Sequence, residues 1–114
     1  MNAPQLTQAE QLYKAAHDMQ PALRERVEET ARLGHLPEET VAAMTEAGFF
    51  RIMQPARYGG FEMDPEVFFE VQMILAEACM STAWVLGVVA IHNWQLALFD
   101  ERAQQDVWGE DDAT

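Results

Sequence analysis

One histidine and two tryptophans stand within an otherwise apolar run in the last third of the chain. Trp84, His92 and Trp94 lie among aliphatic residues in the segment 79–94. A helix that is hydrophobic on all sides is normally buried, and a buried indole N–H or imidazole needs a hydrogen-bond partner. The segment therefore predicts either the central helix of a core with a satisfied histidine, or one wall of a ligand site.

Trp84 and His92 have the spacing of residues that line one wall. The step of eight residues from Trp84 to His92 corresponds to about 12 Å along an α-helix and about 80° around its axis. The small Gly87 and Val88 stand between them and leave room for a flat ligand. From spacing alone, a core histidine bonded to a backbone carbonyl is the favoured interpretation.

The remaining reactive side chains predict no second site. His17 and His35 are expected at the surface, and the three histidines lack the spacing of metal ligands, so we expect no metal site. Cys79 is the only cysteine and is expected to be a small buried hydrophobe. Gly59 and Gly60 are not part of a phosphate-binding loop motif.

The elements that must position these residues are all helical. Apolar residues recur at three- and four-residue steps, and no run alternates as a strand would. Helices are expected over residues 7–32, 37–47, 64–78, 81 to 98 or 99, and 101–108. The fold class is therefore all-α, with five or six helices packed antiparallel or orthogonally.

Local signals mark the expected helix ends. Pro21 predicts a kink or break near Gln20, whereas Gly34 and Gly48 predict helix ends. The helix-starting residues are Pro37, Asp64, Ser81 and Asp100. Residues 49–53 are apolar and precede a proline, so we expect an extended connector that plugs the core, followed by a turn at residues 57–60.

Length and charge exclude several classes of protein. With 114 residues the chain is long enough for one domain. Its net charge is −12 with only seven lysines and arginines, which argues against nucleic acid and anionic membranes as partners. The polar N-terminus does not resemble a signal peptide, and the longest apolar run is too short to cross a bilayer. We therefore expect a soluble, cytoplasmic protein.

Three segments resemble the N-terminal helical domain of the acyl-CoA dehydrogenase superfamily. They are residues 36–41 (LPEETV), 46–51 (EAGFFR) and 55–60 (PARYGG). Residues 78–84 (ACMSTAW), followed by Ile91, His92 and Trp94, resemble more narrowly the flavin-dependent aromatic hydroxylases, which are oxygenase components of two-component monooxygenases acting on phenols. The resemblance extends from about Leu12 to Trp108 and implies a helical bundle like that of the superfamily's N-terminal domain.

The resemblance implies a reaction and its partners. In such enzymes a reductase supplies reduced flavin, FMN or FAD, and one atom of dioxygen passes to the ring carbon ortho to a phenol. His92 matches the family's substrate-binding and catalytic histidine, which would hydrogen-bond the phenolic oxygen. Trp84 matches the tryptophan that borders the substrate, and it would exclude water from the pocket. The complete enzymes are homo-oligomers, expected to be tetramers.

Two departures from the family qualify this interpretation. The chain carries Ala76-Glu77-Ala78 where relatives usually have Ala-Arg-Ala, so a local ion pair must be different or absent. We also expect residues 1–114 to form a single helical domain, with the superfamily's β-barrel and C-terminal helical domains absent from this chain. A fragment of a longer oxygenase is favoured over a split subunit, and the chain alone is expected to be inactive and to bind flavin weakly.

Two other functions stay open at this point. An acyl-CoA dehydrogenase proper would place its catalytic carboxylate in the C-terminal region, although Trp84 and His92 suit a flat phenol better than an acyl chain. A stand-alone helical interaction module without catalysis would use the apolar central helix simply as core.

Overall fold

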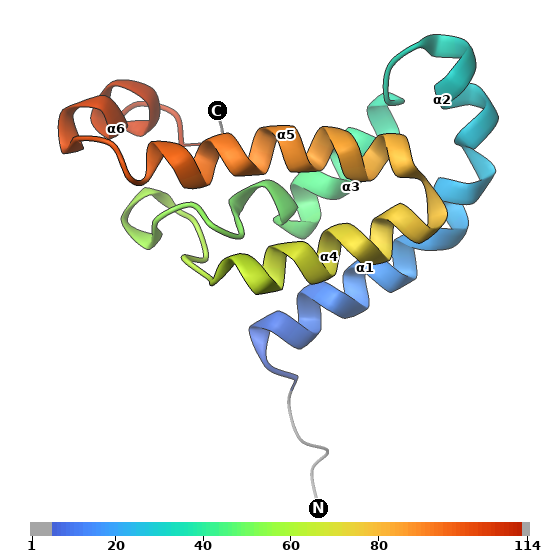
Figure 1. Cartoon of the computed structure of the whole chain (residues 1–114), viewed down its shortest axis with the longest axis horizontal. Helices are drawn as coiled ribbons and strands as arrows, with labels where there is room; N and C mark the ends of the chain where they lie inside the picture. The colour runs from blue at the N-terminus through green and yellow to red at the C-terminus, as the bar shows by residue number, and fades with distance from the viewer. Residues whose placement is uncertain (1–5, 113–114) are drawn as a thin grey trace, which may run out of the picture.

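The computed structural model describes residues 6–112, which form six α-helices, two short 3-10 turns and no strand (Figure 1). This confirms the predicted all-α fold. The elements are α1 (Gln8–Glu25), α2 (Val27–Leu33), α3 (Glu38–Ala47), η1 (Phe49–Arg51), η2 (Ala56–Tyr58), α4 (Pro65–Ala78), α5 (Met80–Leu96) and α6 (Glu101–Trp108).

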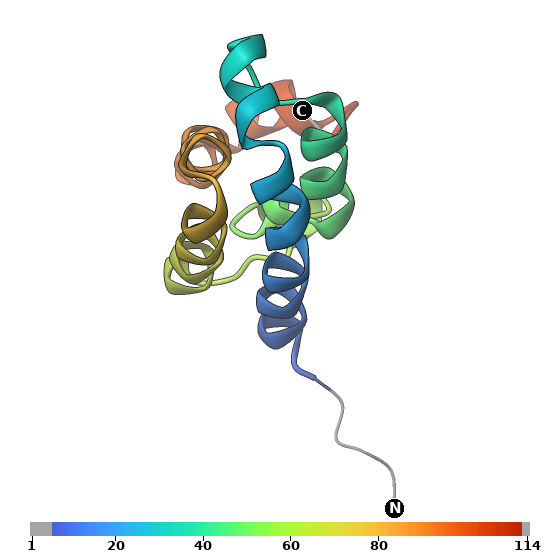
Figure 2. The same ribbon diagram turned by 90° about the vertical axis from the view of Figure 1, so that its right-hand side faces the viewer.

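The core lies where α1, α4 and α5 meet, and η1 closes it. Figure 2 shows α4 and α5 together on one side of α1, with α3 on the other. Buried apolar side chains come from all of these elements: Leu12, Ala16, Leu23, Met44, Phe49, Ile52, Phe68, Val71, Leu75, Leu86 and Ala90. Phe49 and Ile52 are completely buried, so the predicted plug is confirmed. The segment is a 3-10 turn rather than the extended connector expected, because Gly48 turns the chain and its carbonyl accepts a bond from the Arg51 N–H.

The first helical segment breaks at Arg26, not near Gln20 as predicted. Pro21 lies inside α1 with its ring exposed, so that helix continues past it. Arg26 leaves the helical conformation, and its guanidinium donates a hydrogen bond to the Thr40 hydroxyl of α3. The break thus coincides with a contact to a residue in a later helix, and such a contact has no local sequence signal.

A single residue, Cys79, joins α4 to α5. It is buried and extended, its N–H bonds to the Leu75 carbonyl, and its own carbonyl accepts the first bond of α5 from Ala83. The predicted cap Ser81 is wrong, because Cys79 occupies the cap position and Ser81 already lies inside the helix. The expected role of Cys79 as a small buried hydrophobe is confirmed.

Residues 54–60 anchor the last described residues of the chain. The fully buried Gln54 side chain donates hydrogen bonds to the carbonyls of Tyr58 and Asp112. Arg51 bonds the Gly59 carbonyl and forms an ion pair with the Asp112 carboxylate. The predicted turn at residues 57–60 is thus a structural anchor on which the chain folds back.

A second set of contacts docks α6 onto the same turn. The Tyr58 and Trp108 rings lie 5.3 Å apart between centroids. Arg57 forms an ion pair with Glu101 and donates a hydrogen bond to Gln104. The charged and aromatic residues of the PARYGG segment therefore hold α6 in place.

Candidate functional site

Helix α5 is only half buried, contrary to the expectation that packing would cover most of its circumference. Its buried stripe consists of Thr82, Ala83, Leu86 and Ala90. The opposite side is exposed, and there the Trp84 side chain is 70% accessible. A surface that combines aliphatic residues, an indole and an imidazole is unusual for a monomer and marks a contact site for a ligand or for protein.

Trp84, Val88 and His92 form one row on this exposed side. They follow each other at four-residue steps, so their side chains stack along the helix. The His92 ring places Nδ1 2.5 Å from the Val88 carbonyl oxygen in the preceding turn. A carbonyl only accepts hydrogen bonds, so Nδ1 must carry a proton. In the neutral ring Nε2 is then the free acceptor, and no other part of residues 6–112 bonds to it.

The prediction of a core histidine bonded to a backbone carbonyl is therefore correct for the hydrogen bond and wrong for the burial. His92 does bond a backbone carbonyl, but it is an exposed residue rather than a core one. A surface position leaves one ring nitrogen able to meet a ligand, which a core position would not.

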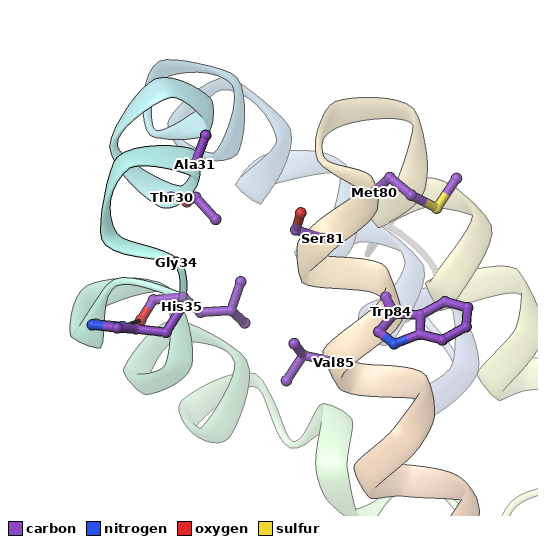
Figure 3. Close-up of a pocket in the computed structure, with 9 residues that line it drawn as sticks. Thr30, Ala31, Gly34, His35, Met80, Ser81, Trp84 and Val85 are labelled. Atoms are coloured by element: carbon purple, nitrogen blue, oxygen red, sulfur yellow. Dashed lines mark hydrogen bonds between the residues drawn. The ribbon is translucent and has the colours of Figure 1, made fainter.

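Trp84 stands at the junction of two hollows. A cleft of about 460 Å³ separates the N-terminal part of α5 from the α2–α3 turn, and its lining includes His35, Ser81, Trp84 and Val85. Figure 3 shows Ser81 and Val85 pointing across this cleft, whereas the Trp84 ring is turned toward the other side of α5. There a smaller recess of about 240 Å³ lies between α4 and α5. His92 lines neither hollow, so Trp84 and His92 share a face of the helix without sharing a cleft.

Gly87 faces α4 and does not lie in the row with Trp84 and His92. The Gln72 side chain of α4 covers it and donates a hydrogen bond to the Ala83 carbonyl, 3.0 Å away. A Cβ at position 87 would lie 2.3 Å from the Gln72 amide nitrogen. Sequence reasoning did not identify Gln72, because a polar residue on an amphipathic helix gives no sign that it packs across to a neighbouring glycine.

The other singled-out residues lie away from this row. His17 and His35 are exposed, as predicted. Trp94 is partly exposed and lines a different hollow at the C-terminal end of α5. The Glu77 carboxylate accepts a hydrogen bond from the Gln20 side chain of α1.

Tyr58 is the titratable group whose environment changes its behaviour most clearly. Its partial desolvation, and then the hydrogen bond and charge of Glu101, raise the pKa of the Tyr58 phenol above its ordinary value. The hydroxyl lies 3.1 Å from oxygens of both Glu101 and Gln105 in α6. This neutral donor serves the docking of α6 and takes no part in the α5 row.

The exposed face of α5 fits an uncharged aromatic ring and does not fit a phosphate. It offers the Trp84 ring, aliphatic side chains and one imidazole. No lysine or arginine occurs between Arg57 and Arg102, and Arg57 is held by Glu101 and Gln104. Among residues 6–112 the α4–α5 face therefore has no cation to bind the phosphate of a flavin.

Comparison with protein families decides the classification. Residues 7–112 match the model of the acyl-CoA dehydrogenase N-terminal domain. This chain belongs to that family. The family's N-terminal domain thus accounts for the helical bundle described above, and the predicted resemblance is confirmed.

Proteins similar to this chain include flavin-dependent oxygenases. The chain is 46% identical to "Flavin-dependent monooxygenase, oxygenase subunit HsaA" of Mycobacterium tuberculosis. This alignment of 114 residues covers all of this chain and 29% of the relative. The HsaA crystal structure superposes with a TM-score of 0.89 at 47% identity, over 93% of this chain and 29% of that one. An "FADH(2)-dependent resorcinol hydroxylase, oxygenase component" of Rhizobium is 37% identical over 87 residues, 76% of this chain and 21% of the relative. The chain thus spans less than a third of the length of these relatives.

No helix within residues 6–112 combines the length and the hydrophobicity needed to cross a bilayer.

Proposed function

We propose that this chain is the substrate-side helical domain of a flavin-dependent monooxygenase that hydroxylates a phenolic aromatic compound. The observation that carries the proposal is the exposed row of Trp84, Val88 and His92, with the free Nε2 of His92 at one end. The names of the similar proteins, an oxygenase subunit and a resorcinol hydroxylase, support the same reaction class.

His92 binds the phenolic oxygen through Nε2 in this proposal. In the neutral ring, Nε2 accepts the hydrogen bond of the phenol O–H and draws the proton from the oxygen. Phenolate character increases the electron density of the ring at the ortho carbon. The Val88 carbonyl, as a fixed acceptor at Nδ1, stabilises the imidazole in both protonation states and holds its orientation.

Trp84 forms the apolar boundary of the same site. Its ring lies two turns before His92, so a flat substrate placed over Val88 touches the indole at one side and the imidazole at the other. A wall of this kind excludes water from the reacting ring. Reduced flavin supplies the oxygenating chemistry in such enzymes, and this proposal assigns no flavin-binding role to the residues of the α5 face.

The partners follow from the same proposal. They are a phenolic substrate, a reductase that supplies reduced FMN or FAD, and further copies of the oxygenase in a homo-oligomer, which we propose to be a tetramer. Nucleic acid is not a partner in this proposal, since residues 58–101 contain no lysine or arginine.

The test is His92→Ala in the complete oxygenase polypeptide that carries this domain. We expect the substituted enzyme to hydroxylate phenols at least tenfold more slowly, as loss of a proton-transfer group typically costs about 10²–10⁴-fold. We also expect a larger share of the consumed reduced flavin to appear as hydrogen peroxide. The measurement is hydroxylated product formed per reduced flavin oxidised, with hydrogen peroxide determined in parallel.

His17→Ala is the matched control, because His17 is also an exposed helical histidine but lies on α1. Unchanged coupling and substrate affinity in His92→Ala would remove His92 from the site. A wild-type enzyme that hydroxylates no phenol would refute the function itself.

A further inference from the structure

The turn of α5 that carries His92 lies beyond the last buried residue of that helix. The buried stripe ends at Ala90, and both Ile91 and His92 are exposed. Hollows flank this half of the helix, one of about 300 Å³ toward α3 and η1 and one of about 240 Å³ toward α4. Side-chain packing therefore does little to fix the rotation of this turn about the helix axis.

Asn93 ties the same turn to another element of the fold. Its half-buried side-chain amide donates a hydrogen bond to the Phe50 carbonyl of η1, 2.9 Å away and 43 residues earlier in the chain. η1 is itself held firmly, because Phe49 and the following Ile52 are completely buried in the core. The Asn93 bond thus fastens a weakly packed turn to a well-packed one.

The direction of the Asn93 side chain determines the direction of the His92 side chain. Consecutive residues lie about 100° apart around an α-helix, so a turn that holds Asn93 against η1 places His92 on the exposed side. Trp84 lies two turns earlier, on the half of α5 that carries most of the buried stripe. A rotation that breaks the Asn93 bond would therefore displace the imidazole sideways relative to the indole.

We propose that Asn93 is the positioning residue of His92, and that its bond to the Phe50 carbonyl holds the imidazole where Nε2 meets the phenolic oxygen. The proposal rests on the proposed function and adds to it a residue that acts through another. Loss of the bond leaves the imidazole chemically intact but displaced. Hydroxylation then slows, and more of the dioxygen consumed is released as hydrogen peroxide instead of entering the product.

A double-mutant cycle in the complete oxygenase tests whether Asn93 acts through His92. The measured quantity is the rate of hydroxylation of whichever of phenol, 4-methylphenol and 4-phenylphenol the wild-type enzyme converts fastest, with product collected over enough turnovers to quantify slow variants. Asn93→Leu keeps a branched side chain and removes the donor. It should lower the rate at least tenfold, since a displacement of about 1 Å in a reacting group can cost about 100-fold. In the His92→Ala background the same substitution should change the remaining rate by less than about twofold, because the group that it displaces is gone.

Two further variants separate positioning from stability. Asn93→Gln keeps an amide donor and should recover most of the rate that Asn93→Leu loses. Gln20 provides the matched control, because its half-buried amide donates a bond of the same kind, 2.7 Å long, from α1 to the Ile74 carbonyl of α4. Gln20→Leu should lower the melting temperature as Asn93→Leu does, but should leave hydroxylation within about twofold of wild type.

The outcomes distinguish this proposal from the proposed function. If the wild-type enzyme hydroxylates none of the three phenols, the proposed function fails and the role of Asn93 fails with it. If the wild type is active, the function stands on its own. The role of Asn93 is then overturned when Asn93→Leu is as fast as wild type, when it slows hydroxylation equally with and without His92, or when Gln20→Leu slows it as much.

Discussion

Exposure, at the scale of single residues, separates the side chains of the proposed site from those of the core. The three tryptophans show this well, because their accessible fractions are 70% for Trp84, 37% for Trp94 and 2% for Trp108. The sequence places all three in predicted helices and gives no means of ranking their exposure. Trp108 packs on Tyr58 and supports the fold, whereas Trp84 contributes little buried area and is available to a ligand.

The exposed position of Trp84 predicts that its removal hardly affects stability. Trp84→Ala in this chain should change the free energy of unfolding by less than about 0.5 kcal/mol, as is usual for surface substitutions. Leu86→Ala, two residues further along α5 at a fully buried position, should cost about 2–5 kcal/mol through cavity formation. Urea unfolding of the two variants measures both values. A large loss in Trp84→Ala would mean that the indole is a core residue.

Individual helices were largely predictable, and the errors occurred where contacts with other elements decide the outcome. Glycine at positions 34 and 48 and the apolar periodicity located the helices correctly. The break at Arg26 could not be predicted, because the Thr40 hydroxyl that Arg26 bonds lies in another helix. The half-exposed state of α5 was missed for a related reason. Hydrophobicity on all sides predicts that a helix is covered, but not which molecule or segment covers it.

Two helix-ending glycines allow two contributions to the free energy of unfolding to be separated: the backbone strain of a positive φ angle and the steric clash of an added Cβ. Gly34 and Gly48 have φ angles of 74° and 83°, where other residues are strained. A Cβ on Gly34 meets no atom within 4 Å, whereas one on Gly48 lies 2.6 Å from the Phe61 ring. Gly34→Ala should therefore destabilise the chain by about 1 kcal/mol.

Gly48→Ala should cost at least about 1 kcal/mol more than Gly34→Ala, the usual penalty for overpacking. Equal losses in the two variants, measured by urea unfolding, would show that the Phe61 ring moves aside freely. A ring that moves aside freely would mean that Phe61 is held mainly by its backbone, whose N–H donates a hydrogen bond to the Arg51 carbonyl at the end of η1.

Across the whole molecule, exposed apolar residues and charged residues are distributed unevenly. Large exposed hydrophobic side chains gather on α4, on α5 and just after it: Phe69, Met73, Met80, Trp84, Val85, Val88, Val89, Ile91, Trp94, Leu98 and Phe99. The net charge of −12 is carried mainly by residues elsewhere on the chain. The charged residues of α4 and α5 are three glutamates, Glu66, Glu70 and Glu77, which suits a neutral aromatic ligand and opposes an anionic one.

This distribution predicts that the 114-residue chain by itself binds flavin weakly. FMN and FAD carry one and two phosphates, and α4 and α5 present no lysine or arginine to them. The isoalloxazine ring of the flavin can stack on Trp84. The free energy of one such exposed contact is largely offset by the entropy lost when the ligand is ordered. Titration of the chain with FMN or FAD, followed by flavin fluorescence, should therefore give no submicromolar dissociation constant. The complete oxygenase, titrated anaerobically with reduced flavin, serves as the positive control. Submicromolar binding to the chain alone, abolished by Trp84→Ala, would show that the α5 face holds the cofactor and would transfer Trp84 from the substrate to the flavin.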